Sequence, residues 1–413
     1  MSGRRDVAII GGGIAGLALA LHLQRRGIPC RIYEAVPELK ELGVGITLLP
    51  HAMRELDALG VVPALAVQSV EIRESRFFNR FGQPIYAEPR GRAAGYAQAE
   101  LGILRGRLHM ALYRAVLGTL GADAIATDHA CVGVASDGDG ASVHFRRTST
   151  GAASDPVRAA VVVGCDGAHS VVRRQFYPGE ATAFAGINSW RGVTRMAPVF
   201  DGHTYMRIGS IHGGKIVLYP IADLADGRQL VNWVVNIQSD TRAMNDWNKP
   251  GRREDFAAHF SDWHFNWLDV PAMIEAAELL LEYPMCDKDP VEHWSFGCVT
   301  LAGDAAHPMY PRGSNGAAQA LIDVRVLAEC LAASPAPADA LREYERRRLP
   351  PTGEIVRTNR SQPPDFINIK VAQLTGDRPF VNLDDFITQA ELRALSDRYK
   401  RVAGFARDGG AQS

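Results

Sequence analysis

A glycine-rich turn, placed between a short apolar segment and a helical one, limits the fold of this chain more than any other feature. Residues 6–10 have the composition of a buried strand, and residues 14–26 that of a helix. The turn between them, residues 11–16, reads Gly-Gly-Gly-Ile-Ala-Gly, and residues 30–33 predict a second strand. A strand, a helix and a strand in this order predict a βαβ unit in a parallel sheet.

The positions of the glycines and of Glu34 predict a nucleotide-binding turn. Gly11 allows a tight turn, Gly13 lets the backbone approach a pyrophosphate, and Gly16 lets the helix pack closely on the sheet. The helix N-terminus would face the phosphates with free N–H groups. Glu34 ends the second strand, where a carboxylate accepts hydrogen bonds from ribose hydroxyls. The alternative is a glycine-rich turn beside a surface glutamate, and the motif alone does not separate NAD from FAD.

Composition argues against several other classes of protein. The chain has 413 residues, which predicts two domains or one large elaborated domain. Its 45 basic and 46 acidic side chains nearly cancel, so no excess charge points to nucleic acid or to an anionic membrane. Six scattered cysteines without a C-x-x-C pair favour a reducing compartment over disulfides, and the sequence shows no metal-ligand spacing.

Residues 7–23 could be mistaken for a signal peptide, because they lack charge and follow Arg4 and Arg5. The glycines near the start of this run would weaken a continuous apolar helix, and no A-x-A-like cleavage site follows it. A strand, a turn and a helix are the better interpretation. We therefore expect a cytoplasmic protein.

The rest of the chain alternates between helical and strand patterns. Residues 105–120 predict a helix, and Asp-Gly and Asp-Pro turns after it predict a β-meander. The strands of this meander are expected over residues 131–135, 141–147 and 157–163. Residues 181–280 contain short alternating runs that predict a mostly antiparallel sheet, with a helical piece near residues 253–281. Past Pro350 the chain is charged and helical, and we expect residues 407–413 to be disordered.

A second motif, residues 303–316, favours FAD over NAD. Asp304 follows an apolar strand and a glycine, so it would lie at the carboxyl end of a sheet strand, where its carboxylate suits a polyol such as ribitol. A helix expected over residues 317–330 would point its N-terminus at the N1–C2=O edge of a reduced flavin, where negative charge develops. Pro308 and Pro311 would stiffen the loop. The alternative is a capped helix after a tight loop.

Three motifs in order carry a family resemblance: residues 11–16 with Glu34, residues 165–173, and Gly303-Asp304 with its loop. Together they resemble the class A FAD-dependent aromatic hydroxylases, the para-hydroxybenzoate and salicylate hydroxylase family, over nearly the whole chain. A closer likeness to the phenazine-1-carboxylate-derivative hydroxylases lies in residues 42–46, 189–194, 230–234 and 309–311. The chain departs from these hydroxylases at Arg312 and Ser314 and after Pro350, which leaves the exact substrate open.

The resemblance implies an α/β fold with two parts. One is an FAD-binding Rossmann-like domain of the glutathione-reductase type, and the other is a mostly antiparallel β-sheet substrate domain. The FAD-binding domain would comprise residues 1–75, 98–180 and 281–350, and the substrate domain residues 76–97 and 181–280. Residues 351–413 would form a C-terminal helical segment.

The resemblance also implies the residues of the site. Those at FAD would be Gly11, Gly13, Ile14, Ala15, Gly16, Glu34, Ala35, Gly45, Ile46, Arg105, Val132, Asp166, Asp304, Gly316 and Ala317. Arg105 would reach the pyrophosphate and ribitol, Val132 would pass the adenine through its backbone, and Asp166 has turn chemistry as its alternative role. The residues at the reactive edge of the flavin would be Pro311, Gly313, Asn315 and Gly316.

Four residues would line the substrate: Arg191, Tyr219, Trp233 and Arg312. Arg191 and Arg312 are the candidates to bind a substrate carboxylate through a bidentate pair, and a salt bridge between domains is the alternative for each. For the aromatic residues the alternative is a place in the core.

The activity implied is a monooxygenase that uses FAD, NADH or NADPH, and O2. A flavin C4a-hydroperoxide would hydroxylate an aromatic or heteroaromatic molecule, carboxylate-bearing and phenazine- or salicylate-like, and decarboxylation could accompany the reaction. The protein would be a monomer or homodimer. The alternatives are an FAD-dependent reductase or halogenase, a non-turnover flavin sensor, and an NAD-dependent dehydrogenase. The W-x-W-x-I-P halogenase motif is absent from the sequence, and a dehydrogenase would leave Asp304 and Asp166 unexplained.

Overall fold

The predicted βαβ unit forms the centre of a six-stranded sheet. The computed structural model describes residues 6–239 and 249–406. In this sheet β1 (Val7–Ile10) lies between β2 (Cys30–Tyr33) and β12 (Val161–Gly164) and is parallel to both. The full order is β21-β22-β12-β1-β2-β8, with β8 at Ile125–Ala126, β21 at Ser295–Phe296 and β22 at Val299–Leu301. The prediction of a parallel sheet built on a βαβ unit is confirmed.

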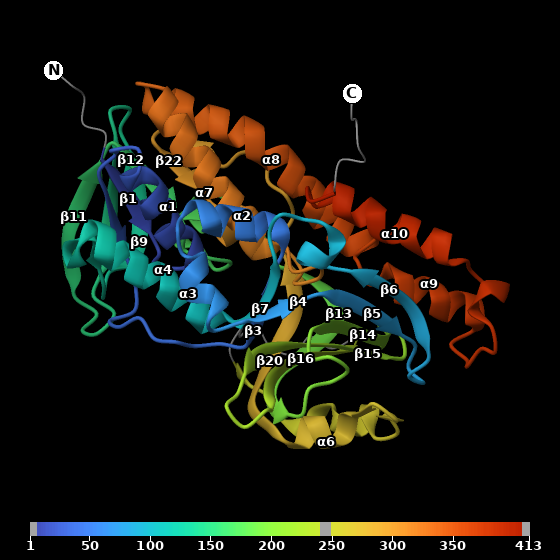
Figure 1. The fold of residues 1–413 in the computed structure, drawn as a ribbon. Helices are drawn as coiled ribbons and strands as arrows, with labels where there is room; N and C mark the ends of the chain where they lie inside the picture. Colours follow the sequence, from blue (N-terminus) through green and yellow to red (C-terminus); the bar gives the residue numbers. More distant parts are fainter. Residues whose placement is uncertain (1–5, 240–248, 407–413) are drawn as a thin grey trace.

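Helices cover this sheet and bring distant segments together. Figure 1 shows α1 (Ile14–Gln24) beside α7 (Gly316–Ala333), with α4 (Arg105–Leu120) on the other side of α1. The helices predicted over residues 14–26, 105–120 and 317–330 are thereby confirmed, with small differences at their ends. Since α1 and α7 both follow strands of the same sheet, their N-termini lie at its carboxyl edge, where ligands bind in such folds.

The predicted β-meander exists, but its third strand is wrong. The meander consists of β9 (Ala130–Ser136), β10 (Ala141–Arg146) and β11 (Ala153–Ala159). The residues predicted as one strand over 157–163 are divided, because the chain leaves the meander at Ala160 and enters the parallel sheet as β12. The N–H groups of Ala160 and Val161 both donate to the carbonyl of Asp6, which marks the transfer.

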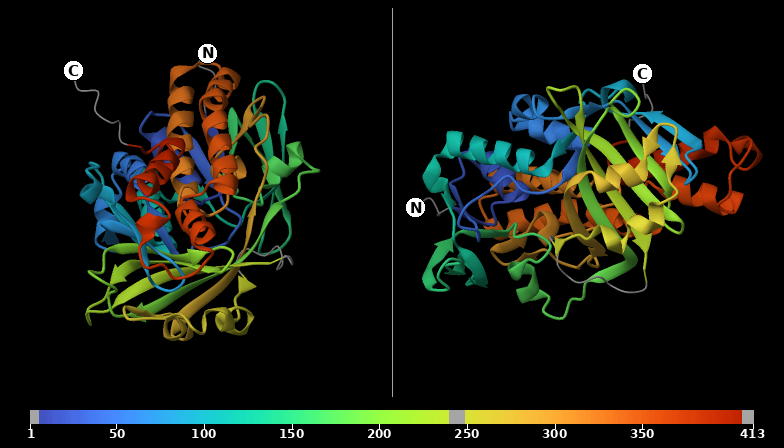
Figure 2. Two further views of the ribbon diagram at one scale, coloured as in Figure 1. Left: turned by 90° about the vertical axis from the view of Figure 1, so that its right-hand side faces the viewer. Right: turned by 90° about the horizontal axis from the view of Figure 1, so that it is seen from below.

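The second large sheet has eight strands and is mostly antiparallel, as predicted. Its order is β17-β20-β13-β16-β15-β14-β5-β6, and only β5 and β14 run parallel. The bounds are β5 Glu74–Phe78, β6 Pro84–Pro89, β13 Ala183–Met196, β14 Thr204–Ser210, β15 Gly214–Asp223, β16 Gln229–Gln238, β17 Lys249–Pro250 and β20 Ala277–Asp287. Figure 2 shows these strands from below, with the yellow segment that contains α6 in front of them.

The helix predicted near residues 253–281 is wrong for most of its length. The chain there forms short 3₁₀ turns, β18 (His264–Phe265), β19 (Leu268–Asp269) and the short helix α6 (Val270–Glu275). From Ala277 it continues as β20, which pairs with β13. The Ala, Glu and Leu residues favour a helix locally, but pairing with a long neighbouring strand overrides that preference.

A small sheet connects the two large ones. It has the order β3-β7-β4, with β3 at Gly45–Leu48, β4 at Val70–Ile72 and β7 at Glu100–Leu104. Strands β4 and β7 contact β15, and β3 contacts β16. Figure 1 shows this sheet at the centre of the molecule, between the α/β part and the eight-stranded sheet.

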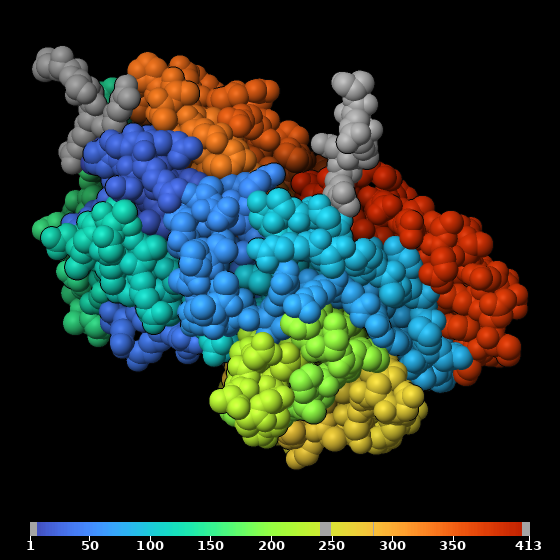
Figure 3. Space-filling model, in the orientation of Figure 1, coloured from blue at the N-terminus to red at the C-terminus, as the bar shows by residue number. Residues whose placement is uncertain are grey.

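The C-terminal part is helical, as predicted, in α8 (Pro337–Ser361), α9 (Phe366–Thr375) and α10 (Gln389–Val402). The domain boundary expected at residue 351 falls inside α8, which contains Pro350 and Pro351. The rest of the domain division stays a prediction, and residues 407–413 lie outside the described residues. Figure 3 shows the red C-terminal helices against the blue segment that contains β5 and β6, where they share an apolar core.

Candidate functional site

The turn between β1 and α1 is tight on the sheet side and open on the helix side. Gly11 has a φ of +104°, and a Cβ there would lie 2.5 Å from the carbonyl oxygen of Cys165. A Cβ at Gly16 would overlap the carbonyl oxygen of Gly11. Gly13 caps α1 without any side-chain hydrogen bond, and a Cβ there would meet nothing within 4 Å. The first N–H groups of α1, from Ile14 and Ala15, are therefore accessible to a phosphate.

Glu34 lies beside this turn, at the end of β2. Its Oε2 accepts from the N–H of Gly12 at 2.6 Å, and its Oε1 accepts from the N–H of Val36 at 2.9 Å. The carboxylate is thus held next to the glycines by backbone donors, and Ala35 follows it in the same loop. Val132 lies on β9 with 51% of its surface exposed, and its contact with adenine stays a prediction.

Asp166 binds the N-terminus of a short helix, α5 (Val171–Phe176), whose N-cap residue is Ser170. Its carboxylate accepts from the Ser170 hydroxyl at 2.6 Å and from the N–H groups of Val171 at 2.7 Å and Val172 at 3.2 Å. Burial raises the pKa of this carboxyl, and the hydrogen bonds partly offset that effect. This role is the turn chemistry given as the alternative, and the contact of Asp166 with FAD stays a prediction.

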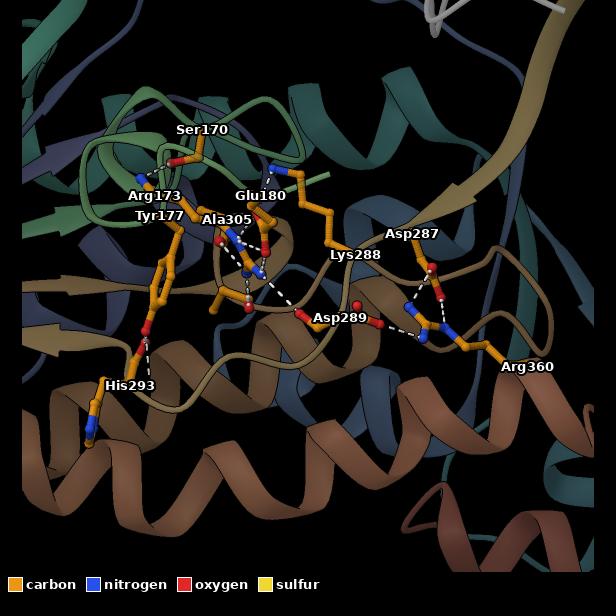
Figure 4. Close-up of polar contacts among 11 residues, drawn as sticks. Ser170, Arg173, Tyr177, Glu180, Asp287, Lys288, Asp289, His293, Ala305 and Arg360 are labelled. Carbon is orange, nitrogen blue, oxygen red and sulfur yellow. Dashed lines mark hydrogen bonds and ion pairs between the residues drawn. The ribbon is translucent and has the colours of Figure 1, made fainter. Parts of the chain in front are cut away.

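Arg173, on α5, extends from this motif to the loop after β22. Its fully buried guanidinium donates to the carbonyls of Ala305 and Ala306, and also to Glu180 and to the carbonyl of Asp289 (Figure 4). Arg173 of α5 therefore fixes the backbone directly after Asp304.

Salt bridges join the two segments that connect the α/β part with the eight-stranded sheet. Lys288, which follows β20, contacts Glu180, which precedes β13, at 2.9 Å. Arg360 of α8 contacts Asp287 at 2.8 Å and Asp289 at 2.6 Å (Figure 4). Together with Arg173, these contacts tie both connections to the loop that carries Asp304.

Asp304 lies just past the carboxyl end of β22, and its side chain keeps accessible surface. Desolvation by the surrounding protein raises the pKa of its carboxyl, with His307 and Arg105 acting in the opposite direction. A Cβ at Gly303 would lie 3.1 Å from the Cβ of Ala15, and one at Gly316 would lie 3.9 Å from Asp304 Oδ1. The structure therefore brings the α1 turn, Asp304 and the N-terminus of α7 together.

The eight-stranded sheet contributes the opposite wall. Asn232 of β16 accepts from the N–H of Gly45 at 2.8 Å, so β16 contacts β3 at the predicted Gly45–Ile46 stretch. Tyr219 of β15 is paired with Asn232 and stacks on Tyr205, with ring centroids 5.1 Å apart. The Arg191 guanidinium lies over the Tyr283 ring at 4.6 Å, and burial lowers its pKa.

These features fit FAD. The open turn at Gly13 leaves room for a pyrophosphate, and the accessible carboxylate of Asp304 is suited to accept hydrogen bonds from a polyol.

Comparison with known proteins decides the family. The FAD binding domain family matches residues 4–359. The phenazine 1,6-dicarboxylic acid hydroxylase of Lysobacter antibioticus is 35% identical over 96% of this chain and 97% of its own length. The chain belongs to the class A FAD-dependent aromatic hydroxylases. The protein is therefore an FAD-dependent aromatic monooxygenase, and NADH or NADPH is the reductant typical of its family.

Other similar proteins agree with this assignment. The 3-amino-4-hydroxybenzoate 2-monooxygenase of Streptomyces cremeus is 34% identical over 87% of this chain and 87% of its own length. The crystal structure of Klebsiella pneumoniae HpxO with FAD and uric acid has a TM-score of 0.76, at 22% identity, over 98% of this chain and 97% of that one. HpxO therefore has the same fold as this chain. Within the described part of the chain, no helix is both long and apolar enough to span a membrane.

One substrate prediction for the hydroxylase is wrong. Trp233 is fully buried on the other face of the eight-stranded sheet, where its Nε1 donates to the Thr194 hydroxyl at 2.9 Å. It packs there with Trp190. Neighbouring residues of a strand point to opposite faces, so the residue that faces Gly45 is Asn232.

Arg312 takes its alternative role, a salt bridge. It is 8% exposed and donates to both carboxylate oxygens of Asp365, at 3.2 and 2.9 Å. Lys215 donates to the same carboxylate at 2.8 Å. Because Asp365 holds the guanidinium, Arg312 is not available for a substrate carboxylate, and Arg191 remains the candidate.

Several residues of the hydroxylase site escaped the sequence interpretation. His51 contacts Asn315 at 2.8 Å, Tyr399 lies against Gly313, and Asp365 holds Arg312. None of them lies in a motif, and each reaches the site from a distant segment. Asn232 was also missed, although its polar side chain in an apolar strand is a signal that the sequence does contain. The neighbouring Trp233 was predicted in its place.

Proposed function

We propose that this monooxygenase hydroxylates an aromatic or heteroaromatic carboxylate, phenazine-like or salicylate-like, and that Arg191 binds the carboxylate. The state of Arg191 carries this proposal. Its guanidinium is half-buried, and its Nε has no hydrogen-bond partner in the described part of the chain. An unpaired cation inside a protein is costly, whereas a carboxylate pairs with a guanidinium through two parallel hydrogen bonds.

The surroundings of Arg191 support an aromatic substrate. Tyr283 and Tyr219 both lie close enough to raise the pKa of its guanidinium against the effect of burial, and the guanidinium lies over the Tyr283 ring. Aromatic rings of this kind can pack against a flat substrate. The names of the two similar enzymes given above also describe action on aromatic acids, which supports the same class.

Bound FAD would supply the redox chemistry of the reaction, with NADH or NADPH as hydride donor and O2 as oxidant. The chain's own residues hold and orient the reactants. The Gly11–Gly13 turn and the N-terminus of α1 would hold the pyrophosphate, and Asp304 the ribitol. We place Pro311, Gly313, Asn315 and Gly316 along the reactive edge of the ring, where they exclude water. Decarboxylation would accompany hydroxylation if the carboxylate is attached to the hydroxylated carbon.

The test is oxidation of NADH and of NADPH by the purified holoenzyme in air. Phenazine, salicylate and quinoline carboxylates are added singly, each beside its methyl ester, and peroxide is assayed in parallel. We expect one acid to accelerate oxidation with little peroxide, its ester to fail, and the product mass to show one added oxygen, with or without loss of CO2. Equal activity on acid and ester would overturn the role of Arg191.

A reductase or a flavin sensor on the same fold is the alternative activity. If no acid accelerates oxidation and the bound flavin is barely reduced by either nicotinamide, these alternatives replace the proposed substrate class. The cytoplasmic location and the state as monomer or homodimer stay predictions.

A further inference from the structure

The turn that carries Asp304 presents one side chain and buries its neighbours. Asp304 keeps accessible surface, whereas the other residues of the stretch 301–310 are all buried. The chain forms a single 3₁₀ turn over Gly303–Ala305, and the N–H groups of Ala306 and His307 both donate to the carbonyl of Gly303, at 2.9 and 3.0 Å. The backbone of the turn is thus closed on itself, and within this stretch the Asp304 carboxylate is what a ligand can reach.

One buried carboxylate, on α7, holds both ends of this turn. Oδ2 of Asp323 accepts from the N–H of Gly303 at 3.2 Å and also from His307 Nε2. Its Oδ1 accepts from Arg348 Nε of α8 at 2.7 Å. Burial acts to raise the pKa of Asp323, but His307 and Arg348 outweigh that effect and hold the pKa below its ordinary value. The carboxylate is therefore ionised, and the His307 ring donates to it.

Stability alone does not account for a charge at this position. A buried ion pair contributes little net stability relative to apolar side chains of similar volume, because desolvation offsets the attraction. What Asp323 adds is geometry, since it ties the turn to the helix whose first residue lies next to Asp304. The ring of His307, which Asp323 holds, also acts against the desolvation that raises the pKa of Asp304. It thereby favours the ionised form, which is the better acceptor for hydroxyl groups.

We propose that Asp323 is a positioning residue that acts on FAD through Asp304. By holding both ends of the turn, it fixes the direction in which the Asp304 carboxylate meets the ribitol hydroxyls. Without it, the turn would keep its own backbone hydrogen bonds but would lose its fixed orientation relative to α7. The inference rests on the role proposed above for Asp304 and does not depend on the identity of the substrate.

The first experiment compares the binding of FAD with that of ADP, which contains the adenosine and the pyrophosphate but no ribitol. Asp323→Asn keeps the shape of the side chain and removes its charge. We expect the Kd for FAD to rise about tenfold, the cost of one oriented hydrogen bond to a charged group. The Kd for ADP should stay within twofold of the wild type, because ADP would bind at the α1 turn and Glu34. Titration of the FAD-free protein with each ligand measures both constants.

A double-variant cycle tests whether Asp323 acts through Asp304. Asp304→Asn by itself should raise the Kd for FAD at least tenfold. The double variant should bind FAD no more weakly than Asp304→Asn alone, because a carboxylate that is absent needs no positioning. If Asp323 supported FAD by another route, the two losses would multiply to about 100-fold.

Variants of the two partners of Asp323 keep the test valid even if Asp323→Asn does not fold. His307→Gln keeps a donor and should bind FAD nearly as the wild type does, whereas His307→Leu should act like Asp323→Asn. Arg348→Met is the matched control, because it removes the partner of the other oxygen. It should lower the melting temperature and leave the ratio of the two Kd values unchanged.

Three results would overturn the inference. If Asp323→Asn weakens FAD and ADP by the same factor, Asp323 stabilises the domain in general. If the losses in the cycle multiply, or if Asp304→Asn alone weakens FAD while Asp323→Asn does not, Asp323 does not act through Asp304, whose own role stands. If Asp304→Asn leaves the Kd for FAD unchanged, the role proposed for Asp304 fails, and the inference fails with it.

Discussion

Asn232 and Trp233 are neighbours in β16, yet they belong to different parts of the enzyme. Trp233 faces outward into an apolar core that includes Trp190 and residues of α6, the helix that lies beneath the eight-stranded sheet in Figure 1. Asn232 faces inward and accepts from the N–H of Gly45 in the small central sheet. The outer face of the eight-stranded sheet thus stabilises the fold, and its inner face forms a wall of the site.

The inner face is polar over several strands. Besides Arg191, it carries Lys215 paired with Asp365, and Arg207 donating to Ser75 at 2.6 Å. The sheet register places Lys215 opposite Asn236 of β16, on the same face. The difference between the faces teaches that one alternating strand pattern can specify a core and a binding wall at once.

The largest effect expected from this comparison is on stability and comes from the outer face. Trp233→Ala should lower the free energy of unfolding by about 3–5 kcal/mol, because it empties a fully buried site. FAD affinity and KM at low temperature should stay within twofold of the wild type. Urea unfolding and flavin titration check both values, and Trp233→Phe serves as the milder control. A change in KM with little loss of stability would place Trp233 in the site after all.

The same contrast explains what could be predicted from the sequence. The turn at residues 11–16 and the Asp304 loop were predictable because their residues are contiguous and their roles depend on local backbone geometry. The face on which Trp233 lies depends on the register of β16 with β13 and β15, which no single strand reveals.

Long-range pairs were out of reach for a related reason. His51 and Asn315 are 264 positions apart, and Arg312 and Asp365 are 53 apart. The strand β20 was mistaken for helix because its composition is helical and its partner β13 lies far earlier in the chain. Sequence patterns describe the preference of a segment, whereas these features depend on what the fold places beside it.

The next effect in size should fall on catalysis and not on stability. Arg191→Gln should lower kcat/KM for an aromatic acid about 100-fold, by the loss of a bidentate charged pair. Its melting temperature should not fall, since the variant removes a half-buried guanidinium whose Nε lacks a hydrogen-bond partner among the described residues. Arg191→Lys keeps the charge without the fork and should lose about tenfold. Steady-state kinetics and thermal unfolding measure the two quantities, and a large stability loss with unchanged kinetics would make Arg191 a structural residue.

A smaller effect concerns the buried charges of the inner face and appears as a pH dependence. Burial lowers the pKa of Lys215 to about 8, with Arg312 and Arg207 acting in the same direction and Asp365 against it. The unfolded chain keeps this proton up to about pH 10.4, so between pH 8 and that value the unfolded state binds more protons and stability rises with pH.

Lys215→Met should abolish that contribution, which amounts to about 2 kcal/mol between pH 8 and pH 10 relative to the wild type. Denaturant unfolding at a series of pH values measures the difference. Lys249→Met, at the exposed edge of the same sheet, is the matched control and should leave the pH dependence unchanged. If the free energy of unfolding changes with pH in the same way in the wild type and in Lys215→Met, Lys215 keeps an ordinary pKa.

The smallest effect returns to the pair of neighbours in β16. Asn232→Ala removes the acceptor of the Gly45 N–H, a loss of about 1 kcal/mol that acts locally. Hydrogen exchange of the peptide that contains Gly45 should accelerate about fivefold, while exchange in β13 and β15 should not change. Trp233→Phe should do the reverse, with faster exchange throughout the sheet and none specific to Gly45. If both variants loosen Gly45 equally, the two faces of the sheet are mechanically coupled, and the separation between core and binding wall is less strict than the contacts indicate.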